Sequence, residues 1–244
     1  MSKKFFVVSD VHGHFTELRE ALDRVGFDPL NGEHVFVSCG DLFDRGNENV
    51  QIYSFVRSLE RKILVKGNHD DMLRDILTDG ALSEDAVSNG TDNTFREFFG
   101  ENSIDSKGRV ALIDSEKAAE LADFLDSMVD YYEEGKYIFV HGWVPIVLDE
   151  RVYPRVNPAW REAGEEAWRY VRWVGWWQTY DKGAVIEGKT IVCGHRPARM
   201  GRIFDSSREP DSDYPFFGNG VIAIDPYVTR SGRVEVLVLE YLED

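Results

Sequence analysis

Five short clusters of polar residues have the types and spacing needed to bind metal ions. Each follows an apolar run of about three to five residues, which is within the length of a strand. The clusters are Ser9-Asp10-Val11-His12-Gly13, Gly40-Asp41-Leu42-Phe43-Asp44-Arg45-Gly46, Gly67-Asn68-His69-Asp70, His141-Gly142 and Gly194-His195. Ligand-binding residues of open α/β sheets gather beyond the carboxyl ends of strands. The five clusters are therefore predicted to meet at one sheet edge.

Six residues of these clusters offer oxygen or nitrogen donors, enough for two divalent metal ions. Asp10 and His12 are two positions apart in an extended loop, so both can face one ion. A second carboxylate, an amide and two imidazoles come from Asp41, Asn68, His141 and His195. Mixed donors favour Mn, Fe, Zn, Ni or Co over Ca, and the lack of thiolate ligands argues against a closed structural zinc site.

The five motifs, in this order, resemble those of the calcineurin-like metallophosphoesterases. The second motif ends in Asp44-Arg45-Gly46, and this ending is similar to the motif of the phosphoprotein phosphatase branch. That branch includes bacterial and phage serine/threonine phosphatases and symmetric diadenosine tetraphosphatases. The ending Ile224-Asp225-Pro226-Tyr227 also resembles the family's last hairpin. The resemblance implies an α/β (α+β) fold, a four-layer α/β/β/α sandwich with two mixed β-sheets, and a dinuclear metal site at one edge.

The resemblance also implies a role for each motif residue. Asp10 and His12 resemble ligands of the first metal ion, and Asp41 resembles the bridging ligand. The residues that resemble ligands of the second metal ion are Asn68, His141 and His195. Arg45 would clamp the phosphoryl oxygens, and His69, oriented by Asp44, would protonate the leaving group. A hydroxide bridging the two metal ions would attack phosphorus directly.

This chemistry suits phosphoester hydrolysis on physical grounds as well. An anionic nucleophile must approach an anion, so the site needs cations that neutralise phosphoryl oxygens and hold a hydroxide at neutral pH. The planar guanidinium of Arg45 matches two phosphoryl oxygens and binds more strongly as charge develops on them. An imidazolium held by a carboxylate, as in His69 with Asp44, can protonate a departing alkoxide near neutral pH.

Three residues are predicted to contact substrate: Arg45, Asn68 and Arg172. Arg172 is the nearest candidate for the family's second phosphate-binding arginine, because the usual W-x-R pattern is missing from Arg172-Trp173-Val174-Gly175-Trp176-Trp177. Two other positions depart from the phosphatase branch. Ser9 replaces a glycine before the first aspartate, and Asp70 replaces a glutamate after the histidine of the third motif.

The elements that must position these residues alternate between strand and helix in the first half of the chain. This β-α-β-α pattern favours a central sheet flanked by helices. Residues 1–244 are predicted to form one metallophosphoesterase domain, with insertions at 82–108 and 154–180. The last third carries β-branched runs at 190–193, 220–225 and 234–241, which suggest antiparallel strands.

The segment 154–180 is rich in tryptophan and allows two interpretations. It is predicted to form a helical cap, with Trp173 and Trp177 at i,i+4 spacing on one helical face, packed as a core. The same rings could instead stack on a nucleobase, which would favour a dinucleotide polyphosphate substrate.

Composition restricts the partners. Lys plus Arg is 28 and Asp plus Glu is 44, so the formal net charge is 28 − 44 = −16. A protein with this net negative charge repels the phosphate backbone of nucleic acids, so no stable duplex binding is expected. No apolar window is long enough for a membrane span, and no signal peptide is recognised, so a cytoplasmic location is expected. Cys39 and Cys193 are predicted to be buried free thiols.

The sequence therefore predicts a metal-dependent phosphoesterase that hydrolyses phosphomonoesters, in particular phosphoserine and phosphothreonine, with two divalent metal ions of which Mn is the first expectation. Its partners would be a phosphorylated protein or a small phosphoester. One alternative is a hydrolase of diadenosine polyphosphates or cyclic nucleotides. An alternative of another class is a catalytically silent module that binds phosphate or a partner. The oligomeric state is left open.

Overall fold

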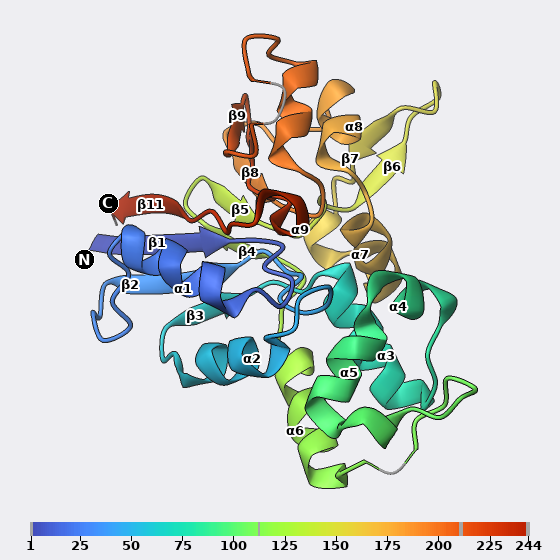
Figure 1. Ribbon diagram of the computed structural model, residues 1–244. Coiled ribbons are helices and arrows are strands. Elements are labelled where there is room, and N and C mark those ends of the chain that lie inside the picture. Colours follow the sequence, from blue (N-terminus) through green and yellow to red (C-terminus); the bar gives the residue numbers. More distant parts are fainter. Residues whose placement is uncertain (1, 112, 210–211, 243–244) are drawn as a thin grey trace.

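Two β-sheets lie face to face in the computed structural model, which describes residues 2–111, 113–209 and 212–242 (Figure 1). The first sheet has the strand order β11-β1-β2-β3, with β1 at Ser2–Val8, β2 at His34–Ser38, β3 at Lys62–Leu64 and β11 at Leu237–Leu242. Strands β1, β2 and β3 are parallel, whereas β11 is antiparallel to β1. The carboxyl ends of three parallel strands therefore meet at one edge.

The second sheet has the order β4-β5-β8-β10-β9. Its strands are β4 (Tyr132–Glu134), β5 (Tyr137–Phe139), β8 (Thr190–Cys193), β9 (Phe216–Gly218) and β10 (Val221–Ala223). The three central strands are parallel, and β4 and β9 pair antiparallel at the edges. The expectation of antiparallel strands is thus wrong for β8 and β10, because residues 194–220 are long enough to return the chain to the starting end of the sheet.

Helices cover the outer face of the first sheet. They are α1 (Phe15–Arg24), α2 (Asn49–Ser58), α3 (Asn68–Asp79), α4 (Glu84–Asn89), α5 (Thr91–Phe99) and α6 (Ser115–Asp126), with the short 3-10 helix η1 (Glu101–Ser103) after α5. Leu18 and Leu22 of α1, like Ile52 and Val56 of α2, recur at i,i+4 and are fully buried against this sheet. These apolar stripes attach the helices to the sheet.

The core between the two sheets follows from the period-2 alternation of the strands. Phe6 and Val8 of β1 lie under the helices, whereas Phe5 and Val7 face the second sheet. Val192 of β8 belongs to the same inter-sheet layer. Strand β1 is therefore buried on both faces, which is why its sequence is a continuous apolar run.

The second sheet is covered on its outer face by tryptophan-rich helices. These are α7 (Glu165–Arg172) and α8 (Trp176–Asp181), preceded by a hairpin of β6 (Ile146–Leu148) and β7 (Pro154–Val156) and by the 3-10 helix η2 (Trp160–Glu162). Trp160, Trp168 and Trp176 are buried against the sheet. The four layers α/β/β/α and the two mixed sheets predicted from the sequence are confirmed.

The two segments predicted as insertions both carry regular structure. Residues 82–108 contain α4, α5 and η1, and Phe95 and Phe98 of α5 belong to the core under the first sheet. In residues 154–180, Trp173 and Trp177 do not share a helix, because α7 ends at Arg172 and α8 begins at Trp176. The prediction that these two rings lie on one helical face is wrong.

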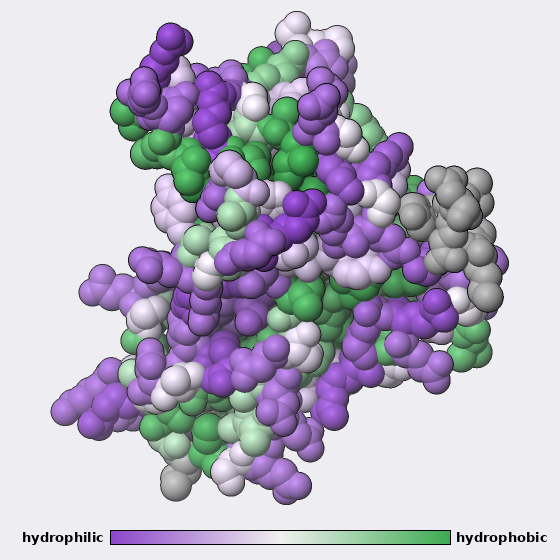
Figure 2. Space-filling view, turned by 180° about the vertical axis from the view of Figure 1, so that it is seen from behind, coloured by the Kyte–Doolittle hydropathy of each residue, from purple (hydrophilic) through white to green (hydrophobic). Residues whose placement is uncertain are grey.

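The remaining described elements are the 3-10 helix η3 (Ala198–Ile203), which follows β8, and the short helix α9 (Val228–Ser231), which follows β10. In the part of the chain that the structure describes, every helix is too short or too polar to cross a membrane. Hydrophilic residues cover much of the face in Figure 2, and the hydrophobic ones lie between them in separate patches.

Candidate metal centre and active site

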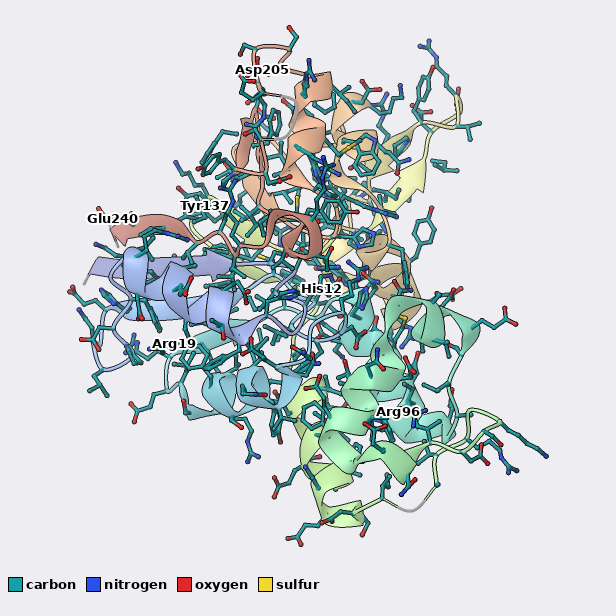
Figure 3. The ribbon with its side chains drawn as sticks, viewed as in Figure 1. His12, Arg19, Arg96, Tyr137, Asp205 and Glu240 are labelled. Atoms are coloured by element: carbon teal, nitrogen blue, oxygen red, sulfur yellow. The ribbon has the colours of Figure 1, made fainter. Side chains whose placement is uncertain are left out.

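The five predicted clusters meet at the carboxyl ends of the parallel strands of both sheets. Asp10 follows β1 and Asp41 follows β2, while Asn68 and His69 form the first turn of α3 just after β3. His141 and His195 follow β5 and β8, and the residues that contribute to these clusters are almost all buried. Figure 3 places His12 in the middle of the molecule, where the two halves of the chain meet. Asp44 and Arg45 lie in the loop after β2.

Backbone hydrogen bonds join the first two loops. The amides of Asp10 and His12 donate to the carbonyls of Gly40 and Asp41 at 3.1 Å each, and Gly13 donates to Leu42 at 3.0 Å. These bonds continue the pairing of β1 and β2 beyond their ends. They fix the two loops side by side before any ligand is considered.

Left-handed backbone is concentrated at this site. Eight non-glycine residues among those described have a positive φ, and seven of them belong to the clusters or line the adjoining pocket: Asp10, His12, Asp41, Asp44, Arg45, His195 and Tyr227. Each such residue costs about 1–3 kcal/mol and persists only where the surroundings determine it. The hydrogen bonds between the loops provide that constraint. The left-handed residues therefore lower the free energy of unfolding, but they direct these side chains into the site.

Two glycines allow parts of the site to approach closely. A Cβ at Gly67 would collide with the carboxylate of Asp41, and one at Gly194 would collide with Ser9 and Asp10. Neither glycine has a positive φ. Both are therefore required by contact with the metal-ligand candidates or their neighbours, and not by a left-handed backbone.

The histidines are oriented by backbone carbonyls. His12 Nδ1 bonds to the carbonyl of Phe43 at 2.9 Å, and His141 Nδ1 bonds to that of Cys39 at 2.8 Å. His195 bonds to the backbone of Trp173, and its Nε2 is buried with no hydrogen-bond partner. When Nδ1–H is donated to a carbonyl, the Nε2 lone pair is free to bind a metal ion.

Asp41 lies at the centre of these imidazoles. Its Oδ2 is 3.3 Å from His141 Nε2, 3.8 Å from His12 Nε2 and 3.9 Å from His69 Nε2. Two groups with mutual ligand distances within 4.8 Å share this carboxylate, namely His12-Asp41-His69 and Asp41-His141-His195. Such an arrangement fits two divalent ions with Asp41 between them.

Asn68 and Asp10 complete the donor set. Asn68 Oδ1 is 2.9 Å from His141 Nε2, and Asp10 Oδ1 is 3.9 Å from His12 Nε2. The other oxygen of Asp10 accepts the Ser9 hydroxyl at 2.5 Å and the His195 amide at 2.9 Å. The buried donors, the orphaned His195 Nε2 and the oriented imidazoles therefore fit the two-metal site implied by the sequence.

The pKa values reflect a dense cluster of buried charges. Burial lowers the pKa of His12 well below its ordinary value, and burial together with His141 lowers the pKa of His195 to about 3. Burial opposes charge on His141 as well, but Asp41 overcomes it and raises the pKa of His141 to about 9. Asp41 is buried too, yet His141 and His69 hold its pKa well below the usual range. His12 and His195 are therefore neutral, the form that binds metal ions.

His69 belongs to a separate hydrogen-bond chain. Its Nδ1 donates to Asp44 Oδ2 at 2.6 Å, and Asp44 accepts the hydroxyls of Thr91 and Thr94, also at 2.6 Å each. Burial opposes protonation of His69, but Asp41 and Asp44 raise its pKa above the ordinary value. The sequence did not indicate the two threonines, because they lie on α5 with no motif around them.

Arg45 connects His69 to His12. Its two terminal nitrogens lie 2.9 Å from His12 Nε2 and 3.0 Å from His69 Nε2. The planar guanidinium thus lies where the metal-ligand candidates and the His69–Asp44 pair meet. It could bind two oxygens of a phosphoryl group there.

The structure does not bring Arg172 to this site. Its Nη1 donates to Asp71 at 2.5 Å, its Nη2 donates to Asp130, and the side chain is only 3% exposed. Asp71 lies on α3 and Arg172 ends α7, so the ion pair joins the two halves of the molecule. A guanidinium occupied by two carboxylates cannot also bind phosphate, which argues against the predicted contact with substrate.

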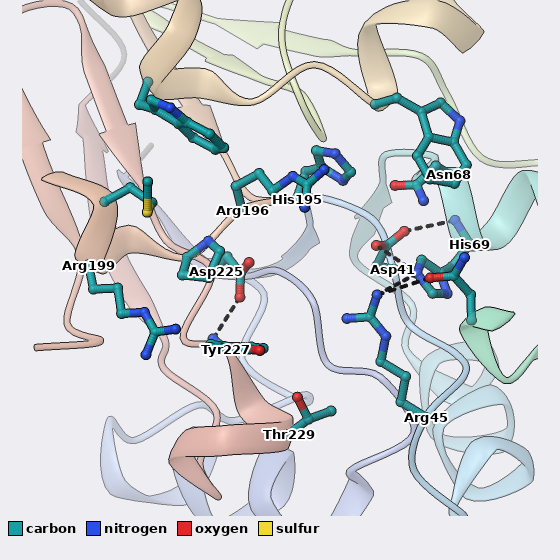
Figure 4. Close-up of a pocket in the computed structure, with 15 residues that line it drawn as sticks. Asp41, Arg45, Asn68, His69, His195, Arg196, Arg199, Asp225, Tyr227 and Thr229 are labelled. Carbon is teal, nitrogen blue, oxygen red and sulfur yellow. Dashed lines mark hydrogen bonds and ion pairs between the residues drawn. The ribbon is translucent and has the colours of Figure 1, made fainter. Parts of the chain in front are cut away.

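A cavity of about 570 Å³ opens beside Asp41, Arg45, Asn68, His69 and His195 (Figure 4). Arg196, Arg199, Asp225 and Tyr227 also line it and were not predicted from the sequence as part of the site. Trp177, which the sequence offered only in the alternative of base stacking, lines it as well. Asp225 follows β10 as His195 follows β8, so its place after an apolar run was an available signal. Trp173, whose side chain is 43% exposed, also lines this cavity.

A sequence model of the calcineurin-like phosphoesterase family matches residues 3–227. The chain belongs to this family, as its five motifs predicted.

Among the curated relatives are proteins named "Bis(5'-nucleosyl)-tetraphosphatase, symmetrical". The protein from Coxiella burnetii is 37% identical over 81 residues, and that from Aromatoleum aromaticum is 40% identical over 77 residues. These matches cover 33% and 31% of this chain, and only 27% and 28% of the relatives' own length. Sequence similarity to them is thus limited to about a quarter of each relative.

Solved structures extend the similarity over nearly the whole chain. The cold-active protein-tyrosine phosphatase of a Shewanella species has a TM-score of 0.57 at 19% identity, covering 97% of this chain and 75% of its own. A protein serine/threonine phosphatase from Saccharomyces cerevisiae has a TM-score of 0.51 at 12% identity, covering 99% and 81%. At such low identity these similarities demonstrate a shared fold.

Proposed function

We propose that this protein is a metal-dependent phosphoesterase that transfers a phosphoryl group directly to water. The observation that carries the proposal is the series Asp44–His69–Arg45, with contacts of 2.6 and 3.0 Å, whose members His69 and Arg45 line one cavity with Asp41. It brings together, within a few ångströms, an acid (His69), a guanidinium that can bind phosphoryl oxygens (Arg45) and a candidate metal ligand (Asp41). No side chain is needed as a covalent nucleophile.

The protein's own groups would act as follows. Arg45 binds two phosphoryl oxygens and strengthens its hold as negative charge grows on them. His69, kept cationic by Asp44 and Asp41, donates the proton on Nε2 to the departing oxygen. Thr91 and Thr94 keep the Asp44 carboxylate in the orientation that His69 requires.

The proposed metal ligands are Asp10, His12, Asp41, Asn68, His141 and His195, with Asp41 shared. Two divalent ions, for which Mn is our first candidate, would neutralise phosphoryl charge and lower the pKa of water toward about 7. The ring orientation set by Phe43 and Cys39 carbonyls keeps His12 and His141 ready for this role.

The first substrate class that we propose is phosphomonoesters, including phosphoserine and phosphothreonine side chains. A second candidate is a dinucleoside polyphosphate. It is favoured by Trp173 and Trp177, which line the cavity and offer aromatic faces to a base, and by the names of the curated relatives.

The test compares hydrolysis of p-nitrophenyl phosphate, a phosphoserine peptide and diadenosine tetraphosphate, with Mn²⁺ and with EDTA. Turnover that requires the metal supports the proposed activity, and the preferred substrate decides between the two classes. If the Mn²⁺-loaded protein hydrolyses none of them although two metal ions are bound, the proposal fails in favour of a phosphate-binding module.

A further inference from the structure

One side of the cavity is lined by residues that the proposed hydrolysis of a single phosphoryl group does not use. Figure 4 shows Arg45 on one side and Arg196 and Arg199 on the other, with Asp225 and Tyr227 between them. The volume of about 570 Å³ lies within the ordinary range of ligand pockets, about 300–1,000 Å³. The cavity therefore has room for more than a phosphoryl group.

The two arginines on this side are not neutralised by the protein. Neither guanidinium forms an ion pair with any residue that the structure describes, although the chain has 44 acidic residues. Arg199 Nη1 is buried and has no hydrogen-bond partner. A buried donor without a partner costs about 1–3 kcal/mol, more when it is charged, so this atom is suited to receive a ligand.

Neighbouring contacts position Arg199. The Arg199 guanidinium lies 4.7 Å from the centroid of the Tyr227 ring, a cation–π distance. Asp225 Oδ1 accepts the amide of Tyr227 at 2.7 Å, and the amide of Ala198 donates to the Asp225 carbonyl at 2.9 Å. The Ala198–Asp225 bond thereby joins the loop after β8 to the loop after β10.

We propose that Arg196 and Arg199 form a second anion subsite, which binds the leaving group of a substrate whose leaving group itself carries phosphate. This proposal rests on the proposed phosphoesterase function and favours the second of its two candidate substrate classes, extended to any phosphoanhydride with a chain of phosphates. Arg45 holds the phosphoryl group under attack, and the subsite holds the phosphates beyond it.

The chemistry gives the subsite a catalytic benefit. The oxygen of water forms a bond to phosphorus, and the bond from phosphorus to the bridging oxygen breaks. The electron pair remains on the bridging oxygen, which becomes a terminal oxygen of the departing phosphate chain, and the proton of water is released. Negative charge on the leaving group therefore grows during the reaction, and guanidinium groups near it bind more tightly in the transition state.

The test measures kcat/KM for diadenosine tetraphosphate, for inorganic tripolyphosphate and for p-nitrophenyl phosphate, with Mn²⁺ present. We expect Arg199→Gln and Arg196→Gln each to lower the ratio of polyphosphate to p-nitrophenyl phosphate activity about tenfold or more. Arg202→Gln is the matched control, because Arg202 lies in the same η3 segment, is exposed and does not line the cavity. It should leave the ratio unchanged.

Equal losses on all three substrates, or an unchanged ratio, would overturn the proposal. A loss confined to diadenosine tetraphosphate, with tripolyphosphate unaffected, would also overturn it, because recognition would then depend on the nucleoside. Titration calorimetry with tripolyphosphate adds a readout that does not need turnover. If the wild type is inactive on every substrate yet Arg199→Gln weakens tripolyphosphate binding about tenfold, the subsite stands and the phosphoesterase function fails.

Discussion

His69 is the residue whose role is most open to a direct kinetic test. Its Nδ1 is held by Asp44 at 2.6 Å, and the residue lines the cavity. In His69→Asn we expect turnover of a phosphoserine peptide to fall about 10²–10⁴-fold, the range for a lost general acid. Turnover of p-nitrophenyl phosphate should fall far less, because an acidic phenol needs little protonation.

The measurement is kcat on both substrates, with bound metal determined by elemental analysis. His14→Asn is the control, since His14 lies near the first motif and does not line the cavity. Equal losses on the two substrates would contradict the general-acid role.

The threonines beneath Asp44 allow a second test at the residue scale. Thr94→Val removes the hydroxyl that donates to Asp44 Oδ1 and leaves that buried oxygen without a partner in the structure. We expect the free energy of unfolding to fall by about 1–3 kcal/mol, together with a loss of turnover on poor leaving groups. Urea denaturation and kinetics measure the two effects. Thr78→Val, at an exposed position of α3, should change neither, and a Thr94→Val enzyme with normal kinetics would exclude a role in orienting Asp44.

At the residue scale, the sequence predicted those groups that directly follow an apolar run. Asp10, Asp41 and His195 could be grouped because each directly follows a strand-like apolar segment. The left-handed backbone of Asp10 and Asp41 could not be foreseen, because it depends on hydrogen bonds between loops about 30 residues apart in sequence. Arg172 was misplaced because its partner Asp71 belongs to a distant helix.

At the scale of elements, the contact of α3 with α7 sets how the two halves of the site meet. Arg172 on α7 is buried with Asp71 on α3, one turn after Asn68 and His69. Arg172→Met should lower the free energy of unfolding by about 3–5 kcal/mol, because it leaves the Asp71 carboxylate buried without its main partner. Combining it with Asp71→Asn should cost less than the sum of the single changes.

Urea denaturation of the wild type, both single variants and the double variant measures this coupling. Arg169→Met serves as control, because Arg169 is more exposed and should contribute only about 0–1 kcal/mol. Additive single changes would show that the pair does not hold α3 to α7.

Strand β4 is joined to its neighbours by an ion pair whose strength depends on pH. The Glu133 carboxylate accepts two hydrogen bonds from Arg161, at 2.7 and 2.9 Å, and lies 2.7 Å from Lys189 Nζ. These two cations lower the pKa of Glu133 from 4.5 to about 2, and Arg161 has the larger effect. The folded-state pKa is the lower one, so the stabilisation is fully present above pH 4.5 and is lost as pH falls toward about 2.

Glu133→Gln should therefore destabilise the protein by about 1 kcal/mol at pH 7, with a difference that shrinks below pH 4.5. Chemical denaturation at pH 7, 4 and 3 measures the trend. Glu20→Gln, at an exposed position of α1 without a cation partner among the described residues, is the control. A difference independent of pH would show that the charge of Glu133 does not contribute.

Across the whole molecule, the candidate metal site concentrates buried carboxylates and imidazoles that are costly without cations. A ligand that binds only the folded state stabilises it by about 2.7 kcal/mol at 100 times its Kd. For a domain of this size we expect Mn²⁺ to raise Tm by about 5–10 °C relative to EDTA-treated protein. Asp41→Asn should reduce both the shift and the bound metal. A Tm unaffected by Mn²⁺ in the wild type would contradict the site.

The four-layer architecture was predictable because strand–helix alternation and motif order act over the whole chain. The parallel pairing of β8 with β10 was not, since alternation of side chains is the same in parallel and antiparallel strands. The helices of residues 82–108 were also missed, because Phe95 and Phe98 are separated by polar residues and become apolar anchors only through contact with the first sheet.

The two cysteines lie in different layers of the sandwich. Cys39 is in the core between the sheets, whereas Cys193 is beneath the tryptophan-rich helices on the outer face of the second sheet, and both thiols are free and fully buried. A thiol reagent can reach Cys39 only when the sheets part, and Cys193 only when the helical layer lifts. The native chain thus carries two built-in chemical reporters, whose separate labelling rates would reveal which layer opens first.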